Sequence, residues 1–594
     1  MSDLNKLADR VINTDVLIIG SEGTGARAAI EVQKLGLDVT VVTKGVMAKS
    51  GATLTADGDI DMDSASATRL LGVEGDLRDS PRIFFEDMIR ESKYISNQEL
   101  VDIHVHEAPE RVVELVEWGA EIDGIVQAQG HSYPRGVWMP GAEVMKALEG
   151  RMKQAPHTLI EHFMVVELIM EGERAVGAAG LKLDTGEFWV IGAKAVIMAT
   201  GGGLRPYPHT TAPDELTGDG QAMAYRAGAE MIDMEFPMFL PYCLLSPVAL
   251  DGVDFPFLMT YFLDGHALNR EGQRYMSRWD PERMEKSTRD INSIAQAVEV
   301  HEGRGGPKGG TYVSFAHLPA NLVEDSGRWF PSTMDNWHYG EIKLKDFLPD
   351  LAREAVETGP ASHYQNGGIR INEHCETNVA GLFAAGEGTG SLMGANRVSG
   401  NAVTSTQVWG YRAGIRAAEF AKDQSPTDPD VDQVQAIRDR TFAPLLREKG
   451  LSPIEVRKTL QNLAGDKIGV VRNQNGLEEA LKTLGEMSDG VSELGTEHKG
   501  KIYNREWMEA LQLPNLILYL QMVGNAALTR TESRGAHYRL DHIKSDNDKW
   551  LKNIVVTRKN GKMDISTAPV VIKHIEPVEG VFDYGHIPEG RWIT

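Results

Sequence analysis

The chain has very few cysteines for its length. Only two, Cys243 and Cys375, occur in 594 residues. Two thiols form at most one disulfide, and they are half of the four ligands that a typical iron–sulfur cluster needs. A disulfide framework and a cluster held by this chain alone are therefore excluded, and we expect a reducing compartment. We expect no metal site in this chain.

Long hydrophobic runs are also missing. The longest weakly charged stretch, residues 236–250, contains Pro237, Pro241 and Pro247. A membrane-spanning helix needs ~20 consecutive apolar residues, so no direct membrane insertion is predicted. The segment MSDLNKLADRV lacks the apolar core of a signal peptide. We expect a cytoplasmic protein, whose association with a membrane would come through partner subunits.

Positive charge is scarce. Lys and Arg number 61 against 85 Asp and Glu, and the formal net charge is −24. Because nucleic acids attract basic surfaces, no nucleic-acid partner is predicted. Hydrophobic residues make up 42% of the chain, as in ordinary folded proteins. The length predicts about two to four domains.

Three apolar strands that end in glycines are the most informative feature present. TDVLIIGSEGTGARAAIEVQKLGLDVTVVTKG is typical of a strand, glycine turn, helix and second strand, and AKAVIMATGGG and GLFAAGEGTG are two further strands. Strands that end in this way mark the ligand edge of a doubly wound α/β sheet. The third strand lies far along the chain, so we expect one nucleotide-binding domain interrupted by an insertion.

These patterns predict the domain boundaries. The nucleotide-binding domain would take residues 1–235 and 351–425, and the insertion residues 236–350. DQSPTDPDVD is a linker by composition. Helical spacing beyond it predicts a mostly helical domain over residues 430–545, and a tail region with some strand character follows over 546–594.

The first glycine turn, residues 20–25, departs from the usual dinucleotide fingerprint. Its second glycine is replaced by Glu22, and a carboxylate there would repel a diphosphate unless Gly23 took over the close approach. No acid ends the second strand to bind a ribose. Asp219, in the turn ELTGDGQAMAYRAGAEM, could accept from a ribose or ribityl hydroxyl, or equally could cap its helix.

The sequence resembles the flavoprotein subunits of the succinate dehydrogenase/fumarate reductase family. The motifs that carry the resemblance are DVLIIGSEGTGARAAI, TGGGLRPYPHTTAPDELTGDGQAMAYRAGAEMIDMEF, STRDINSIAQAVEVHEGRG, HYQNGGI, GLFAAGEGTGSLMGANRVSGNAV and RTESRGAHYRLDH, in the family's order. The resemblance implies an FAD-binding Rossmann-like domain interrupted by an α+β capping domain over residues 236–350, a helical C-terminal domain, and electron exchange with an iron–sulfur partner subunit.

The resemblance also implies which residues bind FAD. Gly20, Gly23 and Gly25 would cradle the pyrophosphate, and Asp219 and Glu387 would hold hydroxyls. The full set of implied FAD-binding residues is Gly20, Glu22, Gly23, Gly25, Thr43, Lys44, Ser50, Gly51, Ala52, Thr53, Gly58, Val166, Ala199, Thr200, Gly201, Asp219, Glu387, Arg397, Gly400, Asn401, Ala402 and Val403. The family's covalent flavin link is a histidine in a Ser-His-Thr sequence. Here Gly51 lies at or next to that place, so FAD is expected to be noncovalent.

The implied substrate site is only partly retained. His363 and Arg397 match the family's carboxylate-binding pair, and arginine suits this task because its planar fork binds a carboxylate in two places. Leu240, however, replaces the substrate-binding histidine. Tyr261 and Leu263 stand where the family has an arginine and a glutamate in an Arg-Gly-Glu-Gly-Gly stretch.

These departures predict a rebuilt, more apolar substrate pocket, lined by Leu240, Tyr242, Tyr261 and Phe262. For the lost proton donor we name Tyr261 and His266 as candidates, and Asp264, Arg274 and Arg289 as alternatives.

The resulting hypothesis is an FAD-dependent oxidoreductase subunit. It would act on a C–C bond next to a carboxylate or acyl group, and ordinary succinate or fumarate turnover is not expected. Two alternatives stay open at this point: sulfur chemistry of the adenylylsulfate reductase type, or a flavin electron-transfer or assembly subunit with no substrate of its own.

Overall fold

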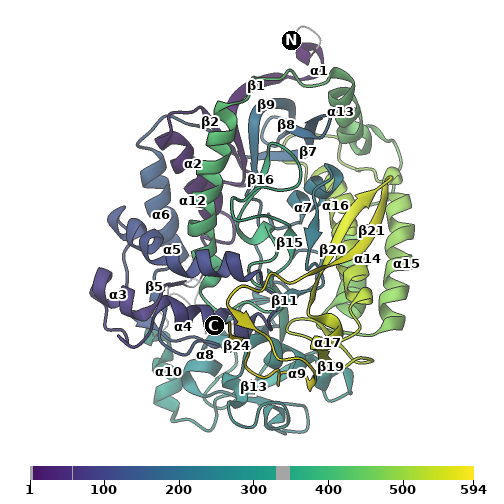
Figure 1. The fold of residues 1–594 in the computed structure, drawn as a ribbon. Coiled ribbons are helices and arrows are strands. Elements are labelled where there is room, and N and C mark those ends of the chain that lie inside the picture. The colour runs from purple at the N-terminus through teal and green to yellow at the C-terminus, as the bar shows by residue number, and fades with distance from the viewer. Residues whose placement is uncertain (1–3, 57, 330–347, 594) are drawn as a thin grey trace.

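The main sheet carries both halves of the interrupted domain. Figure 1 shows the computed structural model, which describes residues 4–56, 58–329 and 348–593. The sheet order is β6-β2-β1-β9-β8-β7, with β16 paired to β9. β6, β2, β1, β9 and β16 are parallel, while β8 and β7 run antiparallel. The strands are β1 Arg10–Ile19, β2 Val39–Val42, β6 Thr158–Ile160, β7 Phe163–Glu171, β8 Arg174–Lys182, β9 Glu187–Met198 and β16 Leu382–Ala384.

β16 confirms the interrupted doubly wound fold, because it returns after the insertion to pair with β9. The insertion builds a second, antiparallel sheet in the order β11-β14-β13-β12. Its strands are β11 Pro237–Leu244, β12 His266–Leu268, β13 Thr311–Ser314 and β14 Val356–Gln365, and the helices α8 Phe255–Leu263 and α9 Arg289–His301 pack on it. β14 lies beyond the expected boundary at 350, because its hydrogen bonds go to β11 and β13.

Helices cover the main sheet and form the last third of the chain. α2 Gly23–Lys34 and α12 Asn401–Lys422 lie side by side on one face (Figure 1). Other helices before the insertion are α3 Ser64–Leu71, α4 Pro81–Glu91, α5 Gln98–Glu117, α6 Gly141–Met152 and α7 Asp219–Arg226. The C-terminal helices are α13 Val431–Leu446, α14 Pro453–Leu463, α15 Gln474–Gly490 and α16 Arg505–Thr529.

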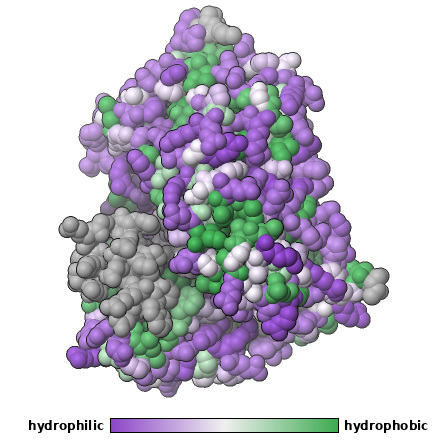
Figure 2. Space-filling view, turned by 90° about the vertical axis from the view of Figure 1, so that its left-hand side faces the viewer, coloured by the Kyte–Doolittle hydropathy of each residue, from purple (hydrophilic) through white to green (hydrophobic). Residues whose placement is uncertain are grey.

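The C-terminal tail packs back onto the first domain. β20 Lys552–Lys559 and β21 Lys562–Pro569 form a hairpin, and β20 pairs with β10 Met231–Ile232, which in turn pairs with β15 Gly368–Ile369. Polar residues cover most of the face in Figure 2, and a hydrophobic area lies near its centre. Among the described helices, none has the length and apolar character needed to cross a membrane.

Candidate active site

Two cavities meet at the carboxyl ends of the parallel strands. The larger has a volume of about 440 Å³ and the smaller about 130 Å³. Ala52, Leu216 and Glu387 line both of them. The two cavities therefore form one elongated site, at the edge of the sheet where doubly wound folds bind nucleotides.

The smaller cavity gathers most of the residues implied to bind FAD. Those that line it are Gly20, Glu22, Thr43, Lys44, Ser50, Gly51, Ala52, Thr53, Ala199, Thr200, Gly201, Asp219 and Glu387. The larger cavity is lined by Gly58, Arg397, Gly400, Ala402 and Val403, together with Ala52 and Glu387. These residues come from strand ends and the loops after them, so the fold collects side chains that are distant in sequence.

Four implied residues do not line either cavity. Gly23 and Gly25 lie within the turn and the first turn of α2. Val166 packs in a separate apolar core, at a bulge between Val165 and Glu167 in the pairing of β7 with β8, while its neighbour Val165 lines the cavity. Asn401 is buried in a polar network: its Nδ2 donates to Asp61 Oδ2 at 2.8 Å.

The glycine turn is shaped by close backbone contacts. A Cβ on Gly20 would lie 2.1 Å from the Ala199 oxygen, and one on Gly25 would lie 1.8 Å from the Gly20 oxygen. Gly20 also has a φ of 113°, which side-chain-bearing residues rarely adopt. These two glycines let β1, β9 and the start of α2 meet closely at the cofactor end of the site.

Glu22 is accommodated in this turn as a buried carboxyl. Its Oε2 accepts from the Leu54 N–H at 3.3 Å, while its Oε1 has no hydrogen-bond partner. Burial, and to a smaller extent nearby Glu215, raises the pKa of Glu22 to about 8. Gly51 makes the room, since a Cβ there would lie 2.4 Å from the Glu22 Cδ. At neutral pH the carboxyl is uncharged and does not repel a diphosphate.

Asp219 does not cap its helix. Gly218 occupies the N-cap position of α7, and no side chain caps it. The Asp219 carboxylate instead accepts from Lys44 Nζ at 2.9 Å, Thr217 Oγ1 at 2.7 Å and Asn515 Nδ2 at 2.7 Å. Burial favours the neutral acid, but these donors outweigh it and lower the pKa of Asp219. An ionised acceptor therefore faces the cofactor cavity.

These features fit FAD. An uncharged carboxyl beside the glycine turn, an anchored carboxylate at Asp219 and a long cavity suit its diphosphate, its hydroxyls and its extended shape. Glu387, at the junction of the cavities, accepts from the Gln365 N–H at 3.1 Å, and burial raises the pKa of Glu387 to about 7. It could therefore donate to or accept from a hydroxyl of bound FAD, as the resemblance implies.

Arg397 faces the larger cavity, which Asp59 and Glu387 also line. Its Nη1 donates to the Val398 oxygen at 3.2 Å, its Nε has no partner, and its guanidinium lies 4.6 Å from the centre of the Tyr364 ring. No ion pair links it to any carboxylate in the described ranges. Burial lowers the pKa of Arg397, since desolvation penalises the cation. An anionic ligand would relieve that penalty.

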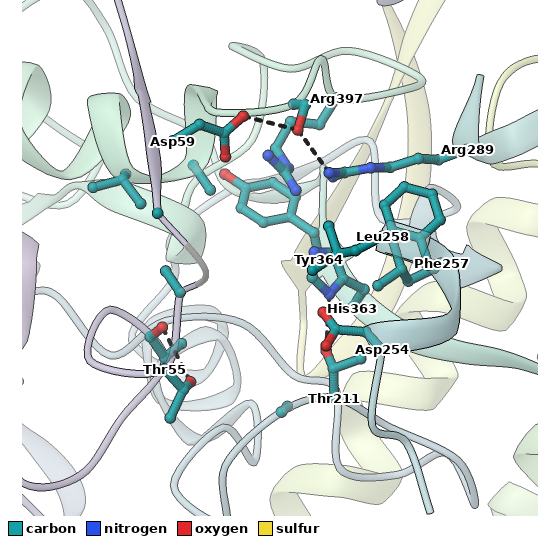
Figure 3. A pocket seen from close by; sticks show the side chains of 18 of the residues that line it. Thr55, Asp59, Thr211, Asp254, Phe257, Leu258, Arg289, His363, Tyr364 and Arg397 are labelled. Carbon is teal, nitrogen blue, oxygen red and sulfur yellow. Dashed lines mark hydrogen bonds between the residues drawn. The ribbon is translucent and has the colours of Figure 1, made fainter. Parts of the chain in front are cut away.

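His363 lies next to Arg397 in the same cavity (Figure 3). It is on β14, and its Nδ1 is 2.8 Å from Thr211 Oγ1. Burial, together with Arg289 and Arg397, lowers the pKa of His363 well below its ordinary value. The imidazole is therefore neutral at physiological pH and can serve as a hydrogen-bonding group beside the arginine.

Arg289, named only as an alternative from the sequence, lines this cavity at the start of α9. Its Nη2 donates to Ser399 Oγ at 2.7 Å, while Nε and Nη1 have no partner among the described residues. Burial and the adjacent Arg397 lower the pKa of Arg289 to about 9. In the motif STRD, Thr288 bonds the Asp290 carboxylate at 2.5 Å, which fixes this helix start. The STRD motif was the one feature of the sequence that could have identified Arg289 as a site residue.

The two candidate proton donors, Tyr261 and His266, lie in different environments. Tyr261 lines the larger cavity from α8, and its hydroxyl donates to the Gln127 oxygen at 3.3 Å. His266 does not line either cavity: it stacks on His317 with ring centres 3.6 Å apart, because its strand position turns the side chain away. His266 is therefore not placed to transfer a proton to a substrate in this site.

The apolar wall of the cavity differs in part from expectation. Leu240 and Phe262 line it, with Phe257 and Leu258 in addition. Tyr242 instead donates to Asn292 Oδ1 at 2.9 Å inside the capping core. The described residues contain no cluster of three side chains suited to hold a metal ion.

Comparisons with known proteins agree with this site. A family model described as an FAD binding domain matches residues 15–403, and one described as the fumarate reductase flavoprotein C-terminus matches residues 457–582. The chain is similar to one of the subunits of the fumarate reductase (CoM/CoB) of Methanothermobacter marburgensis, with 35% identity over 561 residues, covering 92% of this chain and 97% of that protein.

A further relative is a succinate dehydrogenase flavoprotein subunit of Rickettsia bellii, 28% identical, with 96% of this chain and 98% of that protein covered. Among solved structures, Mycobacterium smegmatis Sdh1 is similar, with a TM-score of 0.83, 30% identity, and 94% and 95% of the two chains covered. The chain belongs to the family of FAD-dependent flavoprotein subunits that includes those of succinate dehydrogenase and fumarate reductase.

Proposed function

We propose that this flavoprotein subunit transfers hydride between FAD and a C–C bond adjacent to a carboxylate or acyl group. Bound FAD would supply the hydride chemistry, and the chain would supply binding, orientation and proton transfer. The observation that carries the proposal is Arg397, a buried cation that faces a cavity continuous with the cofactor site and whose Nε has no hydrogen-bond partner among the described residues.

Arg397 would bind one carboxylate or acyl oxygen of the substrate. Its open guanidinium, with His363 beside it, offers N–H donors to an anion that is removed from water. The neighbouring apolar side chains of Leu240, Phe257 and Leu258 suit a bulkier or less charged remainder than that of succinate. The substrate of this chain would thus differ from succinate and fumarate.

Arg289 would exchange the proton with the substrate carbon. Its pKa of about 9 is closer to neutrality than that of an exposed arginine, and efficient proton transfer favours such a match. It lies in the same cavity as Arg397, so one substrate can contact both. Tyr261, whose hydroxyl is held by a backbone oxygen, is the second candidate for this role.

Electrons would pass on to an iron–sulfur partner subunit. The chain has only two cysteines, and Cys243 and Cys375 are both buried and separate, so a cluster would have to be in another chain. The relatives named above are themselves called subunits. Isolation of the native complex, followed by iron and labile-sulfide analysis of the protein that copurifies, tests this part.

The test of the function is a half-reaction without oxygen. The FAD of the purified protein is reduced, mixed with fumarate or with larger α,β-unsaturated carboxylates, and followed by flavin absorbance. We expect at least one larger carboxylate to reoxidise the flavin faster than fumarate does. Fast reoxidation by fumarate alone would contradict the rebuilt pocket, and no reoxidation by any carboxylate would contradict the reaction class.

Arg397→Ala should reduce the reoxidation rate at least ~100-fold, because a bidentate charge-assisted contact is lost, while FAD stays bound. Arg505→Ala is the matched control, since that side chain is 80% exposed on α16. Flavin content by absorbance separates loss of substrate binding from loss of cofactor. An unchanged rate in Arg397→Ala would show that the assignment of Arg397 is wrong.

A further inference from the structure

A second carboxyl-bearing residue, Asp59, lies in the larger cavity at the start of β3 Asp59–Asp61. It shares the lining with Arg289, Arg397 and Ser399. The sequence motifs did not single it out, although Ala52, Thr53 and Gly58 of the same stretch, ATLTADGDI, are implied to bind FAD.

One hydroxyl connects Asp59 to Arg289. Arg289 Nη2 donates to Ser399 Oγ at 2.7 Å, and Ser399 Oγ donates to Asp59 Oδ2 at 3.1 Å. Dashed lines in Figure 3 follow this path from Asp59 to Arg289. Since a serine hydroxyl has one proton and can accept from a second group, the three side chains form a continuous chain of hydrogen bonds.

We propose that Asp59 and Ser399 relay protons to Arg289, which exchanges them with the substrate carbon. This inference rests on the proposed function. In the reducing direction the substrate carbon would take a proton from Arg289 Nη2, while bound FAD would supply the hydride. The Ser399 hydroxyl, which donates to Asp59 in the structure, would turn to give its proton to Nη2 and would take one from protonated Asp59 Oδ2. Asp59 would then be reprotonated from solvent.

The capping domain lacks the acid of the family motif. Leu263, at the position where the family motif has a glutamate, is buried in the core of the capping domain. Asp251, Asp254 and Glu387 also line the cavity, and Figure 3 shows Asp254 near Thr211 and His363. The relay thus enters from the FAD-binding domain.

The electrostatic environment suits proton transfer along this path. Burial and the adjacent Asp61 raise the pKa of Asp59, and Arg289, Arg397 and His131 oppose that effect. Burial and Arg397 lower the pKa of Arg289, which Asp59, Asp254 and Asp61 partly restore. Donor and acceptor are therefore closer in proton affinity than an exposed carboxylate and guanidinium, as an efficient relay requires.

The first test measures protonation without a substrate. Wild-type minus Asp59→Asn infrared difference spectra of the FAD-loaded protein, recorded across pH, should contain a protonated-carboxyl band that disappears as pH rises and that shifts in Ser399→Ala. Because other buried carboxyls such as Glu22 are also protonated, only this difference band belongs to Asp59, and its absence at every pH would overturn the relay. This measurement judges the relay even if no carboxylate oxidises the flavin, a result that would contradict only the proposed function.

The second test uses single-turnover reoxidation of reduced flavin by fumarate and by cinnamate across pH. The wild-type rate should fall as pH rises through the pKa of Asp59, because only the acid form supplies protons. Asp59→Asn should lower the rate ~100-fold, a typical contribution of general acid catalysis, and remove that pH dependence, while Asp59→Glu restores part of both.

Asp254→Asn is the comparison that identifies the acid. The relay predicts that this variant retains the pH dependence and the solvent isotope effect of the wild type. If Asp254→Asn removes the pH dependence and Asp59→Asn retains it, Asp254 is the proton source and the relay is wrong. If Asp59→Asn and Ser399→Ala lower thermal stability with no change in pH profile, the chain of bonds is structural only.

Discussion

At the scale of single residues, Glu22 links cofactor affinity to pH. Its carboxyl has a pKa of about 8 and lies in the glycine turn that faces the cofactor cavity. Below this pH it is neutral, and above it a carboxylate would stand beside the FAD diphosphate. If only the neutral form binds FAD, affinity falls roughly tenfold for each pH unit above the pKa. Fluorescence titration of apoprotein with FAD at pH 7 and at about pH 9.5 measures this fall.

Glu22→Gln should remove the pH dependence, because the amide is neutral and nearly the same shape. Glu121→Gln, at a side chain that is 85% exposed, is the control and should behave like the wild type. Equal pH dependence in Glu22→Gln and wild type would place the titrating group elsewhere.

The sequence could predict which residues gather at the strand ends, but not which of their side chains point into the cavity. Lys44 and Asp219 were named from motifs and meet at 2.9 Å. Val166 is one strand position away from the cavity-lining Val165, and the sequence does not predict strand pairing to an accuracy of one residue. Arg289 could not be preferred over His266, because only the tertiary fold shows which of them the capping domain turns toward the substrate cavity.

At the scale of elements, the contact between α2 and α12 sets the shape of the cofactor end. A Cβ on Gly414 would lie 2.5 Å from the Ala28 oxygen, and one on Gly410 would lie 2.7 Å from the Thr24 oxygen. Both obstacles are backbone atoms, so a methyl group there would push the helices apart. The two helices begin at the glycine turn and at Gly400, which are both part of the site.

Gly414→Ala should therefore destabilise the protein by ~1–3 kcal/mol through overpacking and weaken FAD binding. Gly485→Ala is the matched control: this glycine lies within α15, and a Cβ there meets nothing within 4 Å. Helix propensity predicts that the control gains stability, up to ~1 kcal/mol. Thermal melts of the apoproteins compare the two, and equal melting temperatures would contradict the close contact.

Helices and strands that are adjacent in the sequence were largely predictable. A strand, a glycine turn and a helix within residues 15–42 share one short stretch, so hydrophobic periodicity defines them. β14 was not assigned to the capping domain, because its partners β11 and β13 lie far away in sequence and pairing is a tertiary choice. His363 consequently comes from the capping sheet rather than from the FAD-binding sheet.

At the scale of the whole molecule, the C-terminal helical domain completes the cofactor site. Asn515 on α16 donates from Nδ2 to Asp219 Oδ1 at 2.7 Å and accepts from Arg226 Nη1 at 2.7 Å. On the same helix, the Tyr519 hydroxyl donates to Gln365 Oε1 at 2.7 Å. The helical domain thus anchors a cavity-lining carboxylate that belongs to a different domain, and cofactor affinity should depend on this packing.

Asn515→Ala should weaken FAD binding, because a buried carboxylate loses a donor at a cost of about 1–3 kcal/mol, which is a factor of ~5–150 if expressed in the dissociation constant. Asn525→Ala, farther along α16, is the control: its Nδ2 bonds only the Gln521 oxygen of its own helix. Fluorescence titration with FAD and a thermal melt are recorded for each variant. If Asn515→Ala lowers the melting temperature and leaves FAD affinity unchanged, the helical domain supports the fold without tuning the site. A fall in affinity that Asn525→Ala does not share would show that the two domains act together on the cofactor.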